Sequence, residues 1–369
     1  MQLPKLVIAS ILKPIDDTRM YEKFGVSISQ TDKYEVNIIG FSAKKRPDNE
    51  KINFHPIFNF SRISISRLVA PFRYFYALYK QSPKIIIITT HELLWASLIY
   101  KWLRPCKLIY DIRENYYLNI KYTNSFPLFL KNLIASYVRC KENVIAPSVD
   151  QFILAEKSYA NELPFIQQKF TIIENKSIEF NTNQVLKTET NNNIIQLLFS
   201  GTLANSTGIF EAINLAQNLH EIDARIQLKI IGKSAKSSTL NSIKDQIKEH
   251  PYISLIGGDK LVTHSRIIEA ILSSDFGIIY YPPNIANDRC IPTKLYEYLH
   301  ANLPIITDHK PLIKSITDQY TSAVHIDFKG YDPADLLKQM NQTRFYQKLP
   351  QSEVLWDSEA LKLIEALDL

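Results

Sequence analysis

Four consecutive isoleucines, at positions 85–88, are the feature of this sequence that most constrains its fold. A strand without any polar residue has no face to offer to water, so it must be covered on both sides. A parallel sheet between two layers of helices provides that environment. The run therefore predicts an α/β fold built on a parallel sheet.

Further short, β-branched runs recur along the 369 residues with helical stretches between them, in two sets. The first set comprises Lys5–Ser10, Glu35–Phe41, Lys84–Thr90, Lys107–Asp111, Asn143–Pro147 and Phe170–Glu174. The second comprises Ile194–Ser200, Ile226–Ile231, Tyr252–Ile256, Phe276–Tyr281, Pro304–Thr307 and Ala323–Ile326. A polar stretch that ends in three asparagines predicts a linker over residues 175–193.

We therefore expect two Rossmann-like, doubly wound α/β domains that face each other across a cleft. Ligands of such sheets bind at the carboxyl ends of the strands, so the cleft is the expected site of function. The first domain is predicted over residues 1–178 and the second over 179–350. Residues 351–369 have a helical pattern with Ser352 as its cap, and this helix is expected to pack back across the domains.

The composition limits the compartment and the partners of the protein. A net charge of +6 suits phosphate-bearing ligands or an anionic membrane surface without requiring either. Three scattered cysteines are too few for a disulfide framework or a structural zinc site, which predicts a reducing compartment. No stretch reads as a signal peptide or as a membrane span, so we expect a cytoplasmic protein, soluble or peripheral on the inner face of the cell membrane.

Several common enzyme motifs fail on a single residue. Gly232-Lys233-Ser234 is not a P-loop, because Gln227 stands where the first glycine is required. His91-Glu92 does not begin a zinc-protease helix, because the second ligand position is Trp95. The sequence also lacks G-x-G-x-x-G and G-x-S-x-G, which disfavours dinucleotide oxidoreductases and α/β-hydrolases.

The stretch from Asp275 to Ile306 is the most informative part of the chain. A strand ending at Tyr281 is followed by a polar loop, Pro292-Thr293-Lys294, a helix containing Glu297, and a strand beginning Pro304-Ile305-Ile306. This order resembles the donor-binding half of GT-B-fold glycosyltransferases of the retaining family 4 (group 1) type. Other segments that resemble the family extend over nearly the whole chain, namely Phe199–Thr202 with Gly208, Lys229–Gly232, Pro14–Arg19, Tyr110–Glu114, Asn175 and Leu355-Trp356.

The resemblance implies a nucleotide diphosphate sugar as donor. Glu297 would accept hydrogen bonds from both ribose hydroxyls, and Lys294 and Lys233 would neutralise the leaving diphosphate. Backbone N–H groups around Gly201 and Thr202 would bind its oxygens. The remaining donor-binding candidates are Gly258 and Asp259 near the base, Tyr281 near the sugar, and Pro292 and Thr293 before Lys294. Solvated surface charges, a core tyrosine and a plain turn remain the alternatives for these residues.

The chain departs from the family at two places. The loop from Gly201 to Gly208 lacks the family's Arg and Lys that hold the diphosphate. Arg289 stands where the family has an earlier glutamate, and it either clamps the diphosphate or a sugar carboxylate, or is an ordinary surface arginine. The predicted catalytic residues are Glu297, Lys294, Arg289 and Glu114.

The resemblance further implies front-face transfer with retention, in which the leaving diphosphate assists deprotonation of the acceptor hydroxyl. No metal and no cofactor beyond the nucleotide-sugar co-substrate is expected. On the acceptor side Asp17, Arg19, His91 and Glu114 lie at or just beyond strand ends of the first domain. The alternative is that such residues only satisfy loop backbone.

A membrane surface is a further predicted partner, through residues 62–80. Phe72, Phe75, Tyr76 and Tyr79 recur at helical spacing, and four basic residues lie alongside them, Arg62, Arg67, Arg73 and Lys80. The alternative is that this aromatic face packs on the first domain's sheet.

The first functional hypothesis is a glycosyltransferase that acts on a glycan or lipid-linked glycan in surface polysaccharide or glycoconjugate biosynthesis. The second is a noncatalytic GT-B-like protein that binds a glycan or a partner transferase. The third is a GT-B-fold epimerase, for which Asp111 and Glu114 are the loose acid–base candidates. Nucleic-acid binding is disfavoured because the basic residues are spread along the chain.

Overall fold

The computed structural model describes residues 3–43, 47–60, 64, 66–123, 126–182, 194–286 and 288–368. These form two compact units. The first comprises Met1–Asn175 together with Asp357–Leu369, and the second comprises Lys176–Trp356. Residues 183–193 of the predicted linker and Arg62 of the predicted membrane segment lie outside the described residues.

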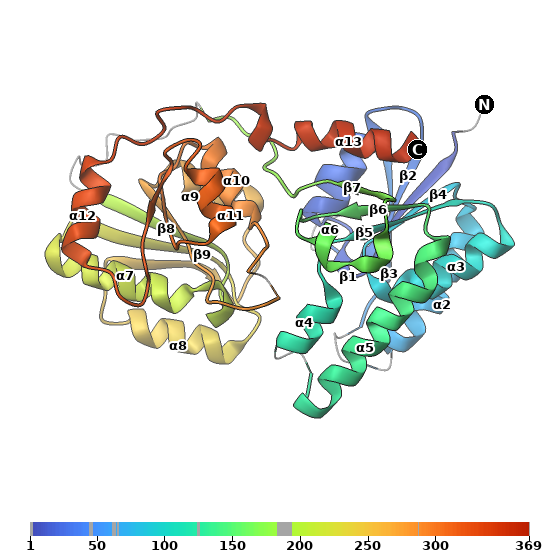
Figure 1. The fold of residues 1–369 in the computed structure, drawn as a ribbon, viewed down its shortest axis with the longest axis horizontal. Helices are drawn as coiled ribbons and strands as arrows, with labels where there is room; N and C mark the ends of the chain where they lie inside the picture. Colours follow the sequence, from blue (N-terminus) through green and yellow to red (C-terminus); the bar gives the residue numbers. More distant parts are fainter. Residues whose placement is uncertain are drawn as a thin grey trace. The chain divides into compact units, whose positions relative to one another are not determined.

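The first unit is built on a sheet of seven parallel strands in the order β3-β2-β1-β4-β5-β6-β7 (Figure 1). The isoleucine run forms β4 at the centre of this sheet, and all four side chains are buried. The strands are β1 (Lys5–Pro14), β2 (Glu35–Phe41), β3 (Ile52–Phe58), β4 (Ile85–Ile88), β5 (Lys107–Ile112), β6 (Gln151–Leu154) and β7 (Phe170–Ile172).

Helices cover both faces of this sheet. The chain moves in one direction along the sheet from β3 to β4, β5 and β6, so the right-handed crossover rule places the connecting helices on one face. The connection from β1 to β2 runs the opposite way and places its helices on the other face. The helices of the unit are η1 (Thr18–Gly25), α1 (Val26–Ser29), α2 (Ser66–Gln81), η2 (His91–Leu93), α3 (Leu94–Leu103), α4 (Tyr116–Tyr122), α5 (Leu128–Ile145), η3 (Ala146–Ser148), α6 (Tyr159–Glu162), η4 (Pro164–Ile166) and α13 (Asp357–Asp368).

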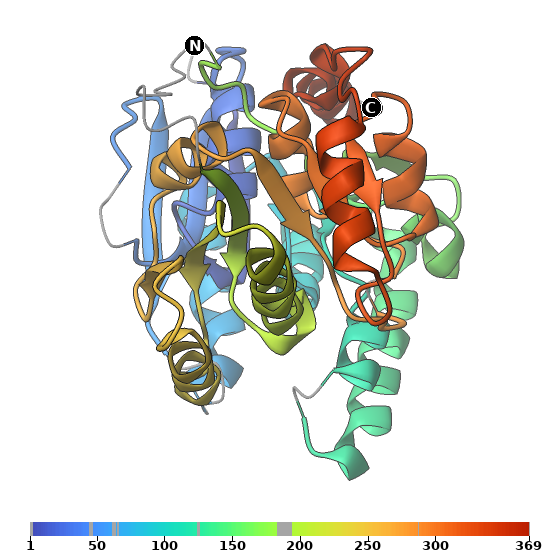
Figure 2. The same cartoon turned by 90° about the vertical axis from the view of Figure 1, so that its left-hand side faces the viewer.

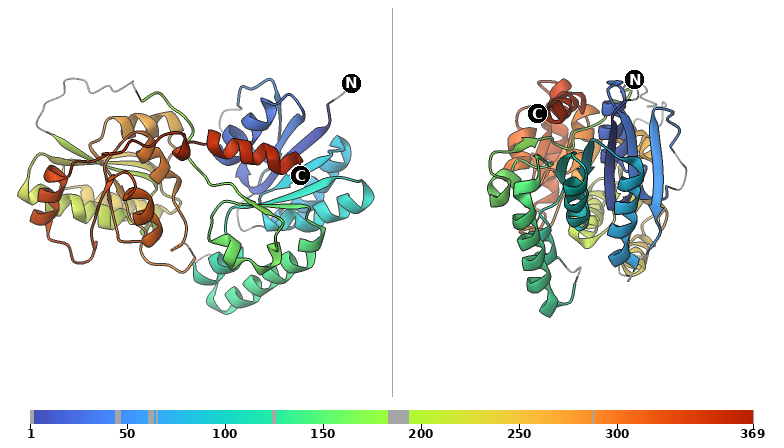
Figure 3. Two further views of the ribbon diagram at one scale, coloured as in Figure 1. Left: turned by 45° about the horizontal axis from the view of Figure 1, so that its top comes forward. Right: turned by 90° about the vertical axis from the view of Figure 1, so that its right-hand side faces the viewer.

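The C-terminal helix α13 belongs to the first unit, although it follows the second unit in the sequence. It packs on η1, α1 and β7, as Figure 3 shows for the red helix beside the blue and green elements. Buried Glu359 accepts the Glu174 N–H at 2.9 Å. Lys107 Nζ donates to the carbonyls of Ala366 and Leu367 at 3.1 and 2.9 Å, where a cation complements the helix C-terminus. The helix begins at Asp357, and the predicted cap Ser352 instead begins a separate short turn.

The second unit repeats the same plan with six parallel strands in the order β10-β9-β8-β11-β12-β13. Its helices lie on both faces of the sheet (Figure 2). One hydrophobic core lies under α7 and α12 and the other under α9, α10 and α11. The strands are β8 (Ile195–Thr202), β9 (Ile226–Lys233), β10 (Ile253–Gly258), β11 (Phe276–Ile279), β12 (Ile305–Thr307) and β13 (Ala323–His325). The helices are η5 (Asn205–Thr207), α7 (Ile209–Ile222), α8 (Ser237–Ile247), α9 (His264–Leu272), α10 (Thr293–His300), α11 (Pro311–Thr317), α12 (Pro333–Gln342) and η6 (Ser352–Val354).

One predicted strand is wrong. Asn143–Pro147 lies at the end of α5 and in the following turn, and its Ile145 shares the buried face of α5 with Val138 and Glu142. The strand of this region is β6, a few residues later. Over the described ranges, no helix is long and apolar enough to cross a membrane.

Candidate active site

Most of the predicted donor-binding residues lie at the carboxyl edge of the second sheet. The register pairs Gly201 with Gly232 and Thr202 with Lys233, and it pairs Lys233 with Gly258 on the next strand. Tyr281 follows β11 by two residues, and α10 begins beside this edge with Thr293. Strands far apart in the sequence thus bring these residues to one edge, as parallel pairing requires.

Glycines let the backbones of this edge approach closely. A Cβ atom on Gly232 would lie 1.7 Å from the carbonyl oxygen of Gly201. A Cβ atom on Gly208, which has a φ of 73°, would lie 2.6 Å from the carbonyl oxygen of Tyr280. Gly201 has a φ of 108° and open space around it, so its backbone conformation alone favours glycine there. The loop from β8 to α7 is therefore held against β9 and β11.

Lys294 is buried beneath the end of β8. Its Nζ donates to the Ser200 carbonyl at 3.1 Å and lies 4.4 Å from the centre of the Phe199 ring. The Tyr281 ring lies 5.3 Å from the same nitrogen. Burial lowers the pKa of Lys294 to about 8, against the opposing effect of Glu297. The structure therefore places a partly desolvated cation under the loop that was predicted to hold the diphosphate.

Glu297 lies one helical turn after Lys294, and only 9% of the residue is exposed. Its Oε1 is 2.9 Å from Nε2 of His264, the first residue of α9. Sequence reasoning missed His264, because the two residues are 33 positions apart and lie in different helices. The pair holds the carboxylate in one orientation at the edge of the sheet.

Tyr281 is half-buried, and burial raises the pKa of its phenol. Lys310 Nζ lies 5.9 Å from the centre of its ring and pairs with Asp288 at 3.3 Å. This ion pair ties the loop after β11 to the loop after β12, and within its own loop Asp288 also accepts the Asn284 N–H at 3.0 Å. Lys310 is a second residue that sequence reasoning did not single out.

The other predicted donor residues are mostly open to solvent. Thr202, Lys233, Asp259 and Arg289 have exposed side chains. Pro292 occupies the N-cap position of α10 and Thr293 its first residue. Arg289 lies in the loop that leads to this helix, so its guanidinium is available to an anion in solution.

The structure places Arg19 in the core of the first unit, not on an open surface as the acceptor prediction requires. Its Nη2 donates to Asp111 Oδ1 at 2.7 Å and to the Ile173 carbonyl at 3.0 Å. A second bond runs from Nε to Asp111 Oδ2 at 3.0 Å. The side chains of Arg19 and Asp111 are 1% and 0% exposed. The pair joins η1 to β5 and to the residue that follows β7.

Asp17 and Glu114, two other acceptor-side candidates, are differently placed. Asp17 caps η1 and accepts from Arg113 Nη1 at 2.8 Å. Burial raises the pKa of Asp17, but the charges of Arg113 and Lys13 and the hydrogen bonds hold it below its usual value. Glu114 is exposed and accepts from the Asn119 amide.

His91 belongs to a largely buried charged cluster beside the end of β4. Lys141 Nζ donates to its Nδ1 at 2.7 Å, and burial lowers the pKa of His91 to about 4. Burial also lowers the pKa of Lys141 to about 8 and raises that of Glu142 to about 7. Glu92 pairs with Arg67 beside them. Burial thus favours the neutral forms of His91, Lys141 and Glu142.

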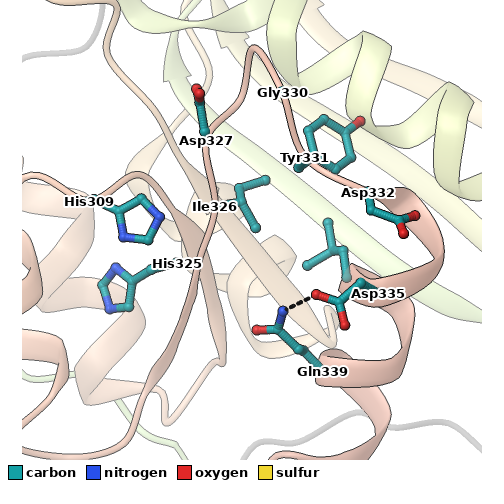
Figure 4. Close-up of a pocket in the computed structure, with 10 residues that line it drawn as sticks. His309, His325, Ile326, Asp327, Gly330, Tyr331, Asp332, Asp335 and Gln339 are labelled. Atoms are coloured by element: carbon teal, nitrogen blue, oxygen red, sulfur yellow. Dashed lines mark hydrogen bonds between the residues drawn. The ribbon is translucent and has the colours of Figure 1, made fainter.

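A pocket of about 250 Å³ opens at the carboxyl ends of β12 and β13 (Figure 4). The His309 and His325 rings lie 5.9 Å apart on one side, and Asp335 and Gln339 of α12 lie on the other. None of the predicted site residues lines it. Within the described part of the chain, no group of three or more His, Cys, Asp or Glu side chains is arranged to hold a metal ion.

No protein-family model and no curated protein matches the sequence. Solved structures resemble the fold over almost the whole chain. Sucrose-phosphate synthase from Thermosynechococcus elongatus is 10% identical with a TM-score of 0.71, covering 99% of this chain and 98% of that one. HepE from Anabaena, solved with UDP and glucose, is 12% identical with a TM-score of 0.67, covering 99% of each chain.

WaaG, a glycosyltransferase involved in lipopolysaccharide biosynthesis, is also similar, at 11% identity and a TM-score of 0.64. The alignment covers 98% of this chain and 95% of that one. At such identities the likeness shows the fold and not the activity. The two parallel α/β units of this chain therefore have the GT-B fold of these glycosyltransferases.

Proposed function

We propose that the protein is a retaining glycosyltransferase that uses a nucleotide diphosphate sugar. The observation that carries the proposal is Glu297, a nearly buried carboxylate held by His264 at the carboxyl edge of the second sheet. A carboxylate there can accept hydrogen bonds from both ribose hydroxyls of the donor. The complexes of HepE with UDP and with UDP-glucose support a nucleotide-sugar donor for this fold.

The diphosphate would lie against the backbone N–H groups of the Gly201–Gly208 loop and the N-terminus of α7. Lys294 adds positive charge from beneath β8, and the exposed side chains of Lys233 and Arg289 add it from solution. In the transfer, the acceptor oxygen bonds to the anomeric carbon while the bond to the diphosphate breaks. The acceptor proton passes to the leaving diphosphate, so the residues position and stabilise charge without a metal.

The acceptor would be a glycan or a lipid-linked glycan in surface polysaccharide or glycoconjugate assembly. Asp17, His91 and Glu114 stay the candidates to contact it. We propose a cytoplasmic location, peripheral on the inner face of the cell membrane, where a lipid-linked glycan would be met. The role of WaaG in lipopolysaccharide biosynthesis supports this class of acceptor.

A noncatalytic glycan-binding or partner-binding role is the second candidate. It is favoured by the loop from Gly201 to Gly208, which carries no Arg or Lys, and by Arg289 in place of a carboxylate. The two functions differ in one measurable property. The transferase needs to bind a nucleotide sugar, and the binding protein does not.

The test is a thermal-shift titration against UDP-, GDP-, CMP- and dTDP-sugars and their free nucleotides. Ligand at 100 times its Kd adds about 2.7 kcal/mol to the stability of the folded state. We expect one nucleotide class to raise the melting temperature, and Glu297→Ala to abolish the shift and sharply reduce donor turnover. Glu269→Gln changes an exposed carboxylate on α9 and should behave as wild type. No shift with any nucleotide at millimolar concentration would favour the binding protein.

A further inference from the structure

Three helices of the first unit expose large apolar side chains that the unit does not bury. Phe72 on α2 is 74% exposed, Trp102 on α3 is 71% exposed, and Phe129 on α5 is 81% exposed. Patches of this kind on a folded unit are typical of surfaces that meet a partner or a membrane. The predicted alternative, that the aromatic face of α2 packs on the sheet, does not hold for Phe72, Tyr76 and Tyr79.

On each helix the exposed side chains recur at intervals of three and four residues, so they share one face. The opposite faces are buried, through Ala70, Tyr74 and Leu78 on α2 and Ala135 and Val138 on α5. The outward face comprises Leu68, Phe72, Tyr76 and Tyr79 on α2, Trp95, Ile99, Trp102 and Leu103 on α3, and Phe129, Leu133, Tyr137 and Val144 on α5. We call these residues the three-helix face.

The three helices form one layer. All three connect strands in the same direction along the sheet, so they cover the same side of it. Helix α3 contacts both α2 and α5, beside which it lies in Figure 1. The Tyr74 hydroxyl lies 2.9 Å from Ser97 Oγ between α2 and α3. The exposed stripes therefore point away from the sheet on one side of the unit.

The charge of this layer selects among possible occupants. The helices carry seven basic residues against a single carboxylate, but Lys131 and Lys141 are buried, and Arg67, Lys101 and Arg139 pair with Glu92, Asp150 and Glu142, so the exposed charge of the layer comes from the other two. That carboxylate, Glu142, is buried, whereas Arg73 and Lys80 are exposed beside the apolar stripe of α2. A second copy of the chain on this face would bring cations against cations, because a twofold interface pairs a patch with itself.

We propose that the three-helix face docks on an anionic lipid bilayer. The exposed Trp, Tyr and Phe side chains would enter the headgroup region while the basic residues contact anionic headgroups. Lys80 is already extended along an aromatic side chain, with its Nζ 5.0 Å from the centre of the Tyr76 ring. The proposal concerns a surface apart from the donor residues, and it holds whether or not the chain transfers a sugar.

The test is sedimentation of the full chain with two kinds of vesicle, phosphatidylcholine alone and phosphatidylcholine mixed with phosphatidylglycerol. We expect binding to the anionic vesicles and weaker binding at high salt. The triple variant Phe72→Ser/Trp102→Ser/Phe129→Ser should lower the partition coefficient by about tenfold or more. The matched control Ile222→Ser/Leu349→Ser/Leu361→Ser changes three exposed apolar residues outside the face and should bind as wild type.

Reversing the charge with Arg73→Glu/Lys80→Glu should also weaken binding to the anionic vesicles. Equal binding of wild type to both vesicles, or equal binding of the triple variant and wild type, would overturn the proposal. So would self-association that the triple variant abolishes without any vesicle binding. The nucleotide-sugar titration in the same variants separates the two proposals, because docking variants should keep the donor response.

Discussion

The buried ion pair of the first unit can be tested by removing one charge. Asp111→Asn keeps the volume of the side chain but leaves the Arg19 guanidinium without a counter-charge, at 1% exposure. Removing one partner of a buried pair costs about 3–5 kcal/mol. We expect Asp111→Asn to lower the free energy of unfolding by about 3 kcal/mol, the lower end of this range, because the asparagine oxygen still accepts one of the hydrogen bonds from Arg19. This is a large part of the 5–15 kcal/mol that stabilises a typical folded protein (about 10 at the centre of the range).

The assay is urea unfolding followed by tryptophan fluorescence in a Trp356→Phe background, in which Trp95 and Trp102 report on the first unit. Replacing both partners, with Arg19→Met/Asp111→Leu, should recover most of the lost stability, because no buried charge remains. If the free energy of unfolding of Asp111→Asn lies within about 0.5 kcal/mol of the reference value, the ion pair does not stabilise the first unit. Lost activity at unchanged stability would return Arg19 to the acceptor site.

Two further predictions concern His91 and Gly232. Burial lowers the pKa of His91 to about 4 from 6.5, so the stability it contributes is present above pH 6.5 and lost as the pH falls through 4. The difference in unfolding free energy between wild type and His91→Gln should shrink by about 3 kcal/mol as the pH falls from 6.5 to 4. A difference that stays constant over this pH range would contradict the lowered pKa of His91. Gly232→Ala should displace β9 from β8 and weaken nucleotide binding, because its Cβ would lie 1.7 Å from the Gly201 oxygen. Gly330→Ala, with its nearest atom at 3.7 Å, is the control, and calorimetric titration compares the two.

Residues whose surroundings are set by local pattern were predictable from the sequence. The isoleucine run had to be a central strand, and Glu35–Phe41 was predicted to the residue because turn residues and a β-branched run mark both ends. Asn143–Pro147 failed because three apolar residues in succession, Val144 to Ala146, fit either a strand or the end of a helix. Short runs do not distinguish the two periods.

Contacts between segments that are far apart in the chain could not be predicted from the sequence. Nothing in the spacing of Glu297 and His264 indicates that they meet, and an arginine near a strand end, such as Arg19, could face inward or outward equally well. The three-helix face was missed on α3 and α5 for a related reason. An apolar stripe on a helix predicts a buried face. Only the strand order shows which side of the sheet each helix covers, and therefore which face of the helix stays exposed.

The place of α13 has a consequence for how the chain is made. The first unit needs its last helix for the acceptor of the Glu174 N–H and for the carbonyls that bind Lys107. Domains generally fold in order as they leave the ribosome, at about 5–20 residues per second. Here the first unit stays incomplete while all of Lys176–Trp356 is synthesised, and it is completed only when α13 has left the ribosome. Truncation after Trp356 would therefore destabilise the first unit more than the second, although the deleted residues directly follow the second unit in the sequence.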